Sequence, residues 1–437
     1  MDHAQLRSAF PSLARGTAYF DGPGGSQVPA VVAEAVAAAM TSGLCQRGTA
    51  TTTERRTEAV TVAARQAVAD LVGGDPRGVV FGRSMTQLTL DLARTLSSGW
   101  GPGDEVVVTR LDHDANIRPW VLAAERAGAT VRWLGFDPVT AELDDVATVL
   151  SDRTRLVAVT AASNLFGTRP DVARIAAAAH EVGALVHVDA VHLAPHAPVD
   201  LAALGADVLV CSPYKFFGPH LGALVASPAL LETLHPDKLL PSSDAVPERF
   251  ELGTLPYELL AGVTAAVDFI AAIEPGTGER RDRVRASMAA VERREHQLLT
   301  RLLAGLAALD GVTVHGHPAP APAESALVSA FSTAGPGENP DTSADSAWVG
   351  RRTPTVLLTV AGHAPRAVHE HLAALDVNAP SGSFYALEAS RHAGLGDAGG
   401  VRVGLAAYTS EEDVDRLLDG LASLRPVASS APAAPGT

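Results

Sequence analysis

The sequence predicts an α/β protein with a large domain built on a mainly parallel sheet and a smaller α+β domain after it. Three observations support this fold class. Seven Val-rich apolar runs alternate with helix-like stretches between about residues 78 and 226, as in βαβ units. After about residue 258 the pattern changes to long amphipathic helices and shorter strands. Apolar residues make up 47% of the 437-residue chain, which is enough to bury a large core.

The strands predicted for the large domain are continuously apolar, as strands covered on both faces must be. They are residues 78–81, 105–109, 130–134, 155–160, 184–189, 207–211 and 222–226. Helices are expected at 86–98, 118–127 and 170–182 between them. In a sheet of this kind, ligands bind beyond the carboxyl ends of the strands.

In the smaller domain, an apolar helix is expected at 258–273 and a long amphipathic helix at 280–308. Shorter strands are predicted at 312–316, 326–332, 355–360 and 401–406, with helices at 364–374 and 410–423. Residues 333–353 are rich in Gly, Pro, Ser and Asp and are predicted to form a mobile loop. The expected organisation is an N-terminal segment 1–18 packed on the small domain, a large domain 19–258, a small domain 259–426 and a disordered tail 427–437.

The composition restricts the classes of partner. With 34 basic against 49 acidic residues, the net charge is −15, which argues against general nucleic-acid binding. No run of 18 uncharged apolar residues appears, and the N-terminus MDHAQLRSAF lacks an apolar signal core, so no membrane partner is expected. Only two cysteines are present, which excludes a disulfide framework. We expect a cytoplasmic protein.

Lysine is scarce in this chain, because only Lys215 and Lys238 stand among the 34 basic residues. Arginine cannot be deprotonated in a protein and cannot serve as an amine nucleophile. Lys238 lies in the polar stretch HPDKLLP and is predicted to be a surface residue. Lys215 lies in VLVCSPYKFFGPH, where burial would lower the pKa of its amine and favour nucleophilic or Schiff-base chemistry.

Polar side chains stand at the ends of the predicted strands. Asp189 closes the apolar strand 184–189, which is costly unless the carboxylate meets a cation or hydrogen-bond donors. Lys215 follows one βα unit later, so both can face one crevice. The helix that begins at Thr86 after the strand 78–81 offers N–H and hydroxyl groups to an anion. The other strand-end residues are His113, Asn164, His192, Ser212 and Tyr214.

An amine, an acid, an anion cradle and an imidazole are the groups that pyridoxal 5′-phosphate (PLP) requires. Its aldehyde needs an amine, its pyridine nitrogen an acidic partner, its phosphate donors, and its ring a flat neighbour. The competing interpretation is a metal centre built from His113, Asp114, Asp189, His192 and His196. No HExxH or paired-Cys spacing supports a metal, and Lys215 would then have no role.

The residues resemble the class V aminotransferase family of fold-type I PLP enzymes, and within it the cysteine desulfurase-like and isopenicillin N epimerase-type branch. The resemblance extends from YFDGPGGSQVP (19–29) to LAAYTSEEDVDRLL (405–418). It implies a fold-type I PLP-dependent transferase with a seven-stranded sheet. The motifs that carry it are RLDHDANIRPW, ASNLFGT, VDAVHLAPH, CSPYKFFGPH, FELGTLP and VRVGLAAYTS.

The resemblance also implies roles for single residues around the cofactor. Lys215 would form the Schiff base with PLP and move the α-proton, and Asp189 would pair with the pyridine nitrogen. His113 would stack on the ring as a catalytic residue. Asn164 and His192 would approach the 3′-oxygen, although relatives often carry Gln at the position of His192.

For the phosphate and the substrate, the resemblance implies a second set of contacts. Thr254 of FELGTLP would reach the phosphate of a partner subunit, which implies a homodimer, and Arg402 would bind the substrate α-carboxylate. The phosphate cradle would be Met85, Thr86, Ser212 and Tyr214. The remaining substrate-binding positions would be Gly24, Gly25, Ser383 and Tyr385.

One departure from the family bears on the reaction. Cysteine desulfurases carry a mobile Cys just before the strand with the arginine, whereas the corresponding stretch here, NAPSGSFYALEASRH (378–392), has none. Cys211 is predicted to be a small buried apolar residue. Cys45 in SGLCQRGT is the remaining cysteine that could carry sulfur as a persulfide. The loop offers Ser383, Phe384 and Tyr385 for a substrate pocket instead.

The first functional hypothesis is a PLP-dependent C–S β-lyase that acts on an L-cysteine-derived conjugate in specialised metabolism. β-Elimination needs no thiolate acceptor, which agrees with the missing Cys. The alternatives are an amino-acid epimerase, an aminotransferase or a decarboxylation-coupled oxidative deaminase on the same fold. A cofactor-binding protein without turnover is the hypothesis from another class.

Overall fold

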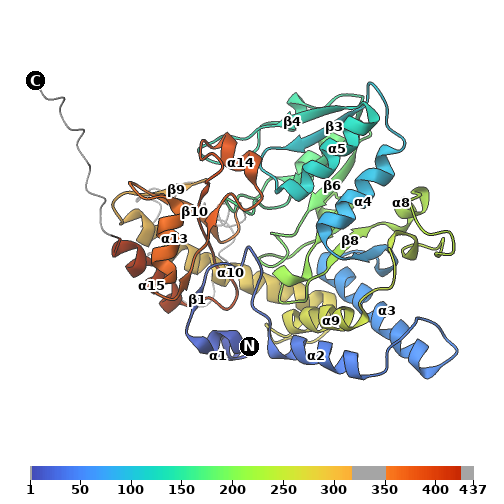
Figure 1. Cartoon of the computed structure of the whole chain (residues 1–437), viewed down its shortest axis with the longest axis horizontal. Coiled ribbons are helices and arrows are strands. Elements are labelled where there is room, and N and C mark those ends of the chain that lie inside the picture. Colours follow the sequence, from blue (N-terminus) through green and yellow to red (C-terminus); the bar gives the residue numbers. More distant parts are fainter. Residues whose placement is uncertain (1, 317–350, 425–437) are drawn as a thin grey trace, which may run out of the picture.

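The computed structural model describes residues 2–316 and 351–424 (Figure 1). The predicted strand 326–332, most of the predicted loop 333–353 and the predicted tail 427–437 lie outside the described residues. None of the described helices is long and apolar enough to cross a membrane.

The predicted large sheet is present, and it has seven strands in the order β2-β8-β7-β6-β5-β3-β4. Strand β8 is antiparallel to both of its neighbours, and the other strand pairs are parallel. The carboxyl ends of β3, β5, β6 and β7 therefore meet at one edge. The strands are β2 (Val79–Gly82), β3 (Glu105–Thr109), β4 (Thr130–Leu134), β5 (Thr154–Thr160), β6 (Leu185–Asp189), β7 (Val208–Cys211) and β8 (Gly222–Ala226).

Helices cover both faces of this sheet, which explains why its strands are apolar throughout (Figure 1). On β3, Val107 belongs to one hydrophobic core and Val106 and Val108 to the other, as the period of two requires. One core includes α3 (Thr52–Val72), α6 (Val172–Glu181), α9 (Tyr257–Ala271) and part of α10 (Arg280–Ala307). The other includes α4 (Met85–Ser97), α5 (Arg118–Ala127) and α8 (Pro228–Thr233).

A second, antiparallel sheet has the order β12-β13-β10-β9 and packs on the C-terminal half of α10. Between this sheet and its helices lies the third hydrophobic core of the protein, which includes Leu299, Leu302, Val356, Val403 and Leu417. The strands are β9 (Val312–His315), β10 (Thr355–Val360), β12 (Ser381–Gly382) and β13 (Gly400–Gly404). The helices that join or cover them are α13 (Pro365–Ala373), α14 (Leu387–His392) and α15 (Glu411–Ala422).

The N-terminal segment contacts the second sheet and then leads into the region between the two sheets. Helix α1 (His3–Ser8) has a capping box at Asp2, and Arg7 forms an ion pair of 2.7 Å with Asp413 of α15. Strand β1 (Ala18–Tyr19) pairs in parallel with β11 (Val377–Asn378). The backbone oxygen of Phe20 accepts a hydrogen bond from Gly404 of β13. The loop 22–29 is thereby fixed beside the second sheet before α2 (Ala30–Thr41) begins.

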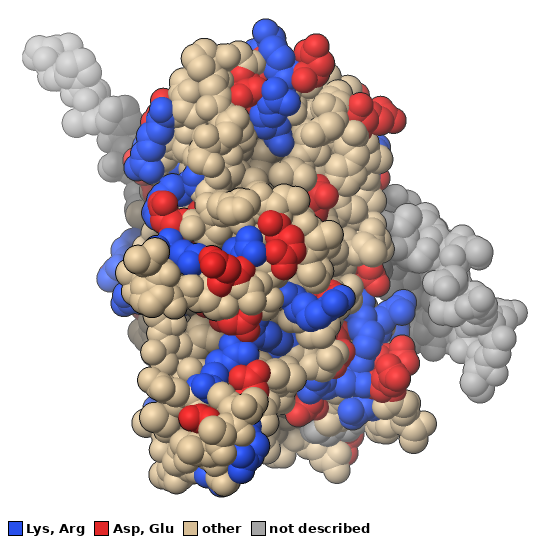
Figure 2. All heavy atoms as spheres, turned by 90° about the vertical axis from the view of Figure 1, so that its right-hand side faces the viewer, with Lys and Arg blue, Asp and Glu red and all other residues tan. Residues whose placement is uncertain are grey.

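Charge on the molecular surface is mixed. On the face shown in Figure 2, basic and acidic side chains alternate among uncharged ones, and the described residues gather into no single basic stripe there. Several charges of the described residues are paired, such as Arg301 with Asp415 at 2.8 Å and Arg132 with the buried Glu105 at 2.7 Å. This face has no basic track for a nucleic-acid backbone to follow.

Candidate active site

Lys215 lies at the carboxyl edge of the large sheet, at the end of a short 3-10 turn (Pro213–Lys215) that follows β7. Its Nζ donates a hydrogen bond to the backbone oxygen of Pro23, and the ring of Tyr214 lies 5.4 Å from it. Burial, with a contribution from the charge of Arg402, lowers the pKa of Lys215 to about 7, and the charge of Asp189 partly opposes this shift. The amine can therefore exchange a proton near neutral pH.

Asp189 is the last residue of β6 and is 4% exposed. Its Oδ1 accepts a hydrogen bond of 2.9 Å from the backbone N–H of Val191. Burial raises the pKa of Asp189 to about 6, while the N–H of Val191 and the charge of Lys215 lower it. The charges of Asp189 and Lys215 affect each other's pKa, so the two side chains lie near each other at the carboxyl edge of the sheet.

His113 follows β3 and caps the turn Asp114–Asn116, where its Nδ1 accepts a hydrogen bond of 3.0 Å from Ala115 N–H. Burial, together with the charges of Lys215 and Arg402, lowers the pKa of His113 to about 4. Its ring stacks on Tyr385 with 5.5 Å between ring centroids and 25° between planes. His113 is thus a neutral, flat group in the crevice.

Arg402 comes from β13 of the second sheet and is 3% exposed. Its Nη1 donates a hydrogen bond of 3.0 Å to the backbone oxygen of Asn164, and its guanidinium lies 3.8 Å from the ring centroid of Phe384. Burial lowers the pKa of Arg402 to about 9, and the charge of Asp21 partly restores it. Among the described residues no carboxylate forms an ion pair with Arg402, so it is available to an anion.

The loop between β12 and α14 adopts a strained backbone. Phe384 and Tyr385 have φ angles of 52° and 59°, which non-glycine residues seldom adopt. Asn164 Nδ2 donates a hydrogen bond of 3.0 Å to the Phe384 oxygen, and Asp114 N–H donates one of 2.7 Å to the Tyr385 oxygen. A further bond of 2.8 Å joins the Ala386 N–H to the Ser383 oxygen. The predicted substrate-pocket residues therefore contact the His113 turn and Asn164.

At Gly24 and Gly25 the N-terminal loop lies next to Arg402 and Tyr214. A Cβ on Gly24 would lie 3.1 Å from the Asp21 oxygen and 3.7 Å from Arg402 Nη2. A Cβ on Gly25 would lie 3.6 Å from the Tyr214 ring. Ser26 N–H donates a hydrogen bond of 3.0 Å to the Tyr214 oxygen, which ties the loop to the Lys215 turn.

The predicted phosphate residues come from the first turn of α4 and from the turn that follows β7. Met85 is buried and Thr86 exposed in the first turn, which Ser84 caps by accepting a hydrogen bond of 3.1 Å from Gln87 N–H. Ser212 is buried at the end of β7. Tyr214 stacks on His220 with 4.8 Å between ring centroids and 9° between planes.

Sequence reasoning missed two features of this region. A Cβ on Gly222 would lie 2.2 Å from the Met85 nitrogen, so this glycine alone lets β8 pass behind the helix N-terminus. The contact of His220 with Tyr214 was also not predicted, and no short-range signal in the sequence indicates it.

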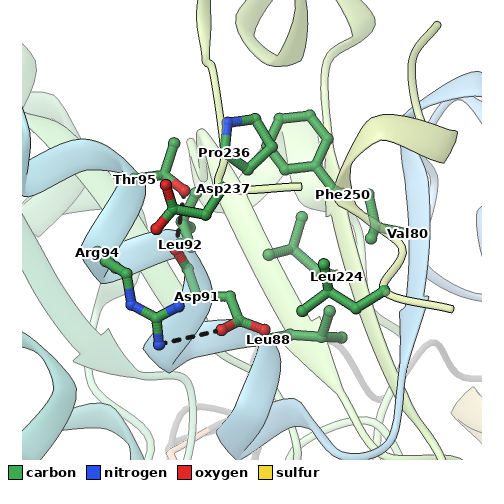
Figure 3. Close-up of a pocket in the computed structure, with 11 residues that line it drawn as sticks. Val80, Leu88, Asp91, Leu92, Arg94, Thr95, Leu224, Pro236, Asp237 and Phe250 are labelled. Atoms are coloured by element: carbon green, nitrogen blue, oxygen red, sulfur yellow. Dashed lines mark hydrogen bonds and ion pairs between the residues drawn. The ribbon is translucent and has the colours of Figure 1, made fainter. Parts of the chain in front are cut away.

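Thr254 is exposed and lines a hollow of about 470 Å³ together with Gly82, Arg83, Gln87 and His220. A neighbouring apolar hollow has Val80, Leu88, Leu224 and Phe250 in its walls, and Figure 3 shows the Asp91–Arg94 ion pair, 3.5 Å long, at its edge. None of the predicted site residues lines that second hollow. Thr254 thus lies at the outer side of α4, and its predicted reach to a partner subunit stays a prediction.

The remaining residues singled out in the sequence are His192, the two cysteines and Lys238, and their surroundings differ. His192 is buried, and its Nε2 lies 3.0 Å from Thr355 Oγ1. Cys211 lies in the core, where burial raises the pKa of its thiol to about 12. Cys45 is exposed in the segment before α3, where its N–H donates a hydrogen bond of 3.1 Å to Thr57. The amine of Lys238 donates a hydrogen bond of 2.9 Å to the Ser242 oxygen.

The described residues contain no group of three or more His, Cys, Asp or Glu placed to hold a metal ion. The crevice instead combines an amine, a carboxyl group, an imidazole and a guanidinium that come from both sheets.

Comparison with known proteins identifies relatives of this arrangement. The family model described as Aminotransferase class-V matches residues 18–336. An uncharacterised protein of Mycobacterium tuberculosis is 35% identical over 97% of this chain and 99% of its own length. A probable cysteine desulfurase 2 of Mycobacterium leprae is 33% identical over 72% of this chain and 78% of its own.

Two solved structures share the fold. The apo cysteine desulfurase of Thermococcus onnurineus has a TM-score of 0.80 at 24% identity, with 96% of this chain and 97% of that chain covered. A C-DES variant with glycine covalently linked to the PLP cofactor has a TM-score of 0.73 at 22% identity, with 96% and 99% covered.

Proposed function

The chain belongs to the class V aminotransferase family, a family of PLP enzymes, and we propose that it is a C–S β-lyase acting on L-cysteine-derived conjugates. The observation that carries the proposal is the buried Lys215 amine, with its pKa near 7, in one crevice with Asp189 and with Arg402, which has no carboxylate partner among the described residues. An α-amino acid brings a carboxylate for the guanidinium and an α-proton for the amine.

The residues of the crevice fit PLP. A flat partner for the ring is available in His113, an acidic partner for the pyridine nitrogen in Asp189, and an amine for the aldehyde in Lys215. The Oδ1 of Asn164 is buried and has no hydrogen-bond partner among the described residues, so a ligand can satisfy it. When bound, PLP supplies the sink for the electrons released at Cα.

The chain's own residues then divide the remaining work. Arg402 would hold the α-carboxylate with its planar fork and so orient the Cα–H bond. Burial lowers the pKa of Lys215 to about 7, which favours the neutral amine, so Nζ would accept the α-proton and later return it. The strained loop of Phe384 and Tyr385 would lie over the substrate and exclude water.

β-Elimination is proposed because the substrate loop offers no sulfur acceptor. The proton on Cα would go to Lys215 Nζ, and the C–S bond would break with its electron pair leaving on sulfur, which is protonated to a thiol. The remaining three-carbon fragment would take up water and give pyruvate and ammonia. Residues 378–392 contain no Cys that could take up sulfur as a persulfide, which supports release of the thiol itself.

We further propose that the enzyme acts as a homodimer in the reducing cytoplasm, in specialised metabolism. The free thiols of Cys45 and Cys211 agree with a reducing compartment. The exposed Thr254 at the rim of α4 agrees with a contribution to a neighbouring site.

The test is incubation of the PLP-loaded protein with S-substituted L-cysteines, followed by thiol and keto-acid assays. Stoichiometric thiol and pyruvate from the wild type, and none from Lys215→Ala, would support the lyase. Inverted amino acid without thiol would replace it with an epimerase, amino-group transfer with an aminotransferase, and release of CO₂ with an oxidative deaminase. PLP binding without any product would indicate a binding protein.

A further inference from the structure

A cluster of buried polar side chains joins the connection after β6 to α10 and β10. It consists of His192, His196, Glu295 of α10 and Thr355 of β10, which we call the histidine cluster. All four side chains are buried, with Thr355 0% and Glu295 1% exposed. The rings of His192 and His196 meet edge to face with 5.2 Å between centroids. Glu295 Oε2 lies 3.0 Å from His196 Nδ1.

The two nitrogens of His192 have different surroundings. Nε2 lies 3.0 Å from Thr355 Oγ1. Nδ1 is buried and has no hydrogen-bond partner among the described residues. A neutral imidazole has one N–H donor and one acceptor nitrogen. The role that Nδ1 can play is therefore decided at Nε2, by whether Thr355 donates its hydroxyl hydrogen to that nitrogen or accepts a hydrogen from it.

His192 is held in the neutral state. Burial places the pKa of His192 well below its usual value, and the neighbouring His196, Lys215 and Arg402 lower it further. The Glu295 carboxylate faces His196 and not His192. A single proton on His192 then has to reside on one of two nitrogens.

The hydroxyl of Thr355 can either donate a hydrogen bond to His192 Nε2 or accept one from it. Its only hydrogen bond among the described residues is the one to His192, because the strand contacts of Thr355 use its backbone N–H and oxygen. A hydroxyl that donates to Nε2 leaves the hydrogen of His192 on Nδ1.

We propose that Thr355 is a positioning residue that donates to His192 Nε2, and so holds His192 as the Nδ1–H tautomer, whose free donor would then be available to the 3′-oxygen of PLP. This inference rests on the proposed function, because it takes PLP to be the ligand beside His192. A donor to that oxygen stabilises its negative charge, so Thr355 would tune the acidity of the bound cofactor without touching it.

The first experiment uses the cofactor-free protein and therefore does not depend on activity. Histidine labelled with ¹⁵N reports the tautomer through its ring-nitrogen shifts, and His192→Gln identifies the His192 signals among the 15 histidines. The wild type and Thr355→Ser should carry the hydrogen on Nδ1. Thr355→Val, which keeps the shape but lacks the hydroxyl, should move it to Nε2. A hydrogen on Nε2 in the wild type, or unchanged shifts in Thr355→Val, would overturn the proposal.

The second experiment titrates the visible absorbance of the PLP-loaded protein with pH. Loss of one neutral hydrogen bond to the 3′-oxygen should raise the midpoint by about one pH unit in Thr355→Val. Thr355→Ser should titrate like the wild type. If Thr355→Val fails to fold, Thr355→Ala takes its place, with the same expected rise.

The control is a double variant. In a His192→Gln background the amide donates by itself, so adding Thr355→Val should leave the midpoint unchanged. A shift of the same size in that background would show that Thr355 acts on the fold and not through His192, which would overturn the inference. Failure of the proposed function looks different: the wild type would bind no PLP, while the ¹⁵N measurement would still report the tautomer.

Discussion

At the scale of single residues, the fold buries three ionisable groups, which are the Lys215 amine, the Asp189 carboxyl group and the Arg402 guanidinium. Burial is the largest cause of each pKa shift: it lowers the pKa of Lys215 to about 7 and of Arg402 to about 9, and raises that of Asp189 to about 6. Each shift favours the uncharged form, so burying these three groups is costly to the fold. A charged ligand that pairs with these groups would recover part of that cost.

The cost of burying Lys215 predicts a pH dependence of stability. The folded pKa, about 7, lies below the value of 10.5 for an exposed amine, so the unfolded state binds more protons between these pH values. The free energy of unfolding should therefore rise with pH across that window, and the penalty is complete below pH 7. At pH 6, the free energy of unfolding of cofactor-free Lys215→Met should exceed that of the wild type by on the order of 2 kcal/mol, after allowance for local relaxation.

Urea unfolding of both proteins at pH 6, 8 and 10 measures this difference, which should shrink as the pH rises. Lys238→Met is the matched control, since it removes the chain's other lysine amine from a position where it pairs with the exposed carboxylate of Asp244. A Lys215→Met advantage that stayed constant from pH 6 to 10 would contradict the buried amine.

The position of Arg402 predicts a loss in substrate binding. Arg402→Lys keeps the charge but loses the planar fork, and the loss of a charged hydrogen bond costs about 2 kcal/mol, or about 30-fold in KM. The PLP absorbance should be unchanged, because Arg402 contacts the Asn164 oxygen and Phe384 and not the Lys215 amine. Steady-state kinetics with an S-substituted cysteine would check it. Equal KM values would show that the carboxylate binds elsewhere.

At the scale of elements, the loop 383–386 combines strain with contacts from distant segments. Two consecutive positive φ angles at Phe384 and Tyr385 cost of order 1 kcal/mol each, and hydrogen bonds from Asn164 and Asp114 hold them. Such a conformation persists only where the surroundings determine it. We take the strain as part of the mechanism that covers the substrate.

A matched pair of variants isolates this strain. Phe384→Gly and Phe384→Ala both remove the ring from the Arg402 guanidinium, but only glycine adopts φ 52° without cost. The glycine variant should therefore be more stable than the alanine variant by about 1 kcal/mol, less the greater entropy of its unfolded chain. Both should bind substrate more weakly than the wild type. Thermal unfolding and substrate titration test the pair, and an alanine variant as stable as the glycine variant would argue against strain.

The same scale shows which features the sequence could predict. The seven strands of the large sheet were predicted because strands covered by helices on both faces are continuous Val-rich runs, as Val106 to Val108 illustrate. The polar residues at their ends follow from parallel topology, so Asp189 and Lys215 were predicted together. The antiparallel direction of β8 could not be predicted, because an apolar run does not indicate in which direction the strand runs. The strands β1, β11 and β12 have too few residues to give a pattern.

Contacts between the sheets could not be predicted from spacing. The hydrogen bond from Arg402 to the Asn164 oxygen joins residues 238 apart, and that from Lys215 to Pro23 joins residues 192 apart. Thr355 meets His192 only because β10 packs against the connection after β6. Such pairs depend on how two independent patterns dock, and no local signal in the sequence encodes that docking.

At the scale of the whole molecule, the crevice is closed by groups from three separate parts of the chain. The large sheet supplies Lys215 and Asp189, the second sheet supplies Arg402, and the N-terminal loop supplies Pro23 and Gly24. Thr254, in contrast, is exposed and lines the hollow beside α4 instead. Its predicted place in the site of a second copy can be tested without a structure of the dimer.

Complementation between an inactive variant and an impaired variant gives that test. Lys215→Ala and Thr254→Ala should each lose turnover as pure dimers, the first completely and the second by about 10-fold through weaker phosphate binding. In a mixed dimer, the subunit with intact Lys215 would receive an intact Thr254 from its neighbour, so one site of two would recover. If Thr254 served its own subunit, the two changes would leave no complete site and mixing would restore nothing. Co-unfolding and refolding the variants at equal concentration, followed by thiol assay and light scattering of the dimer, measures the difference.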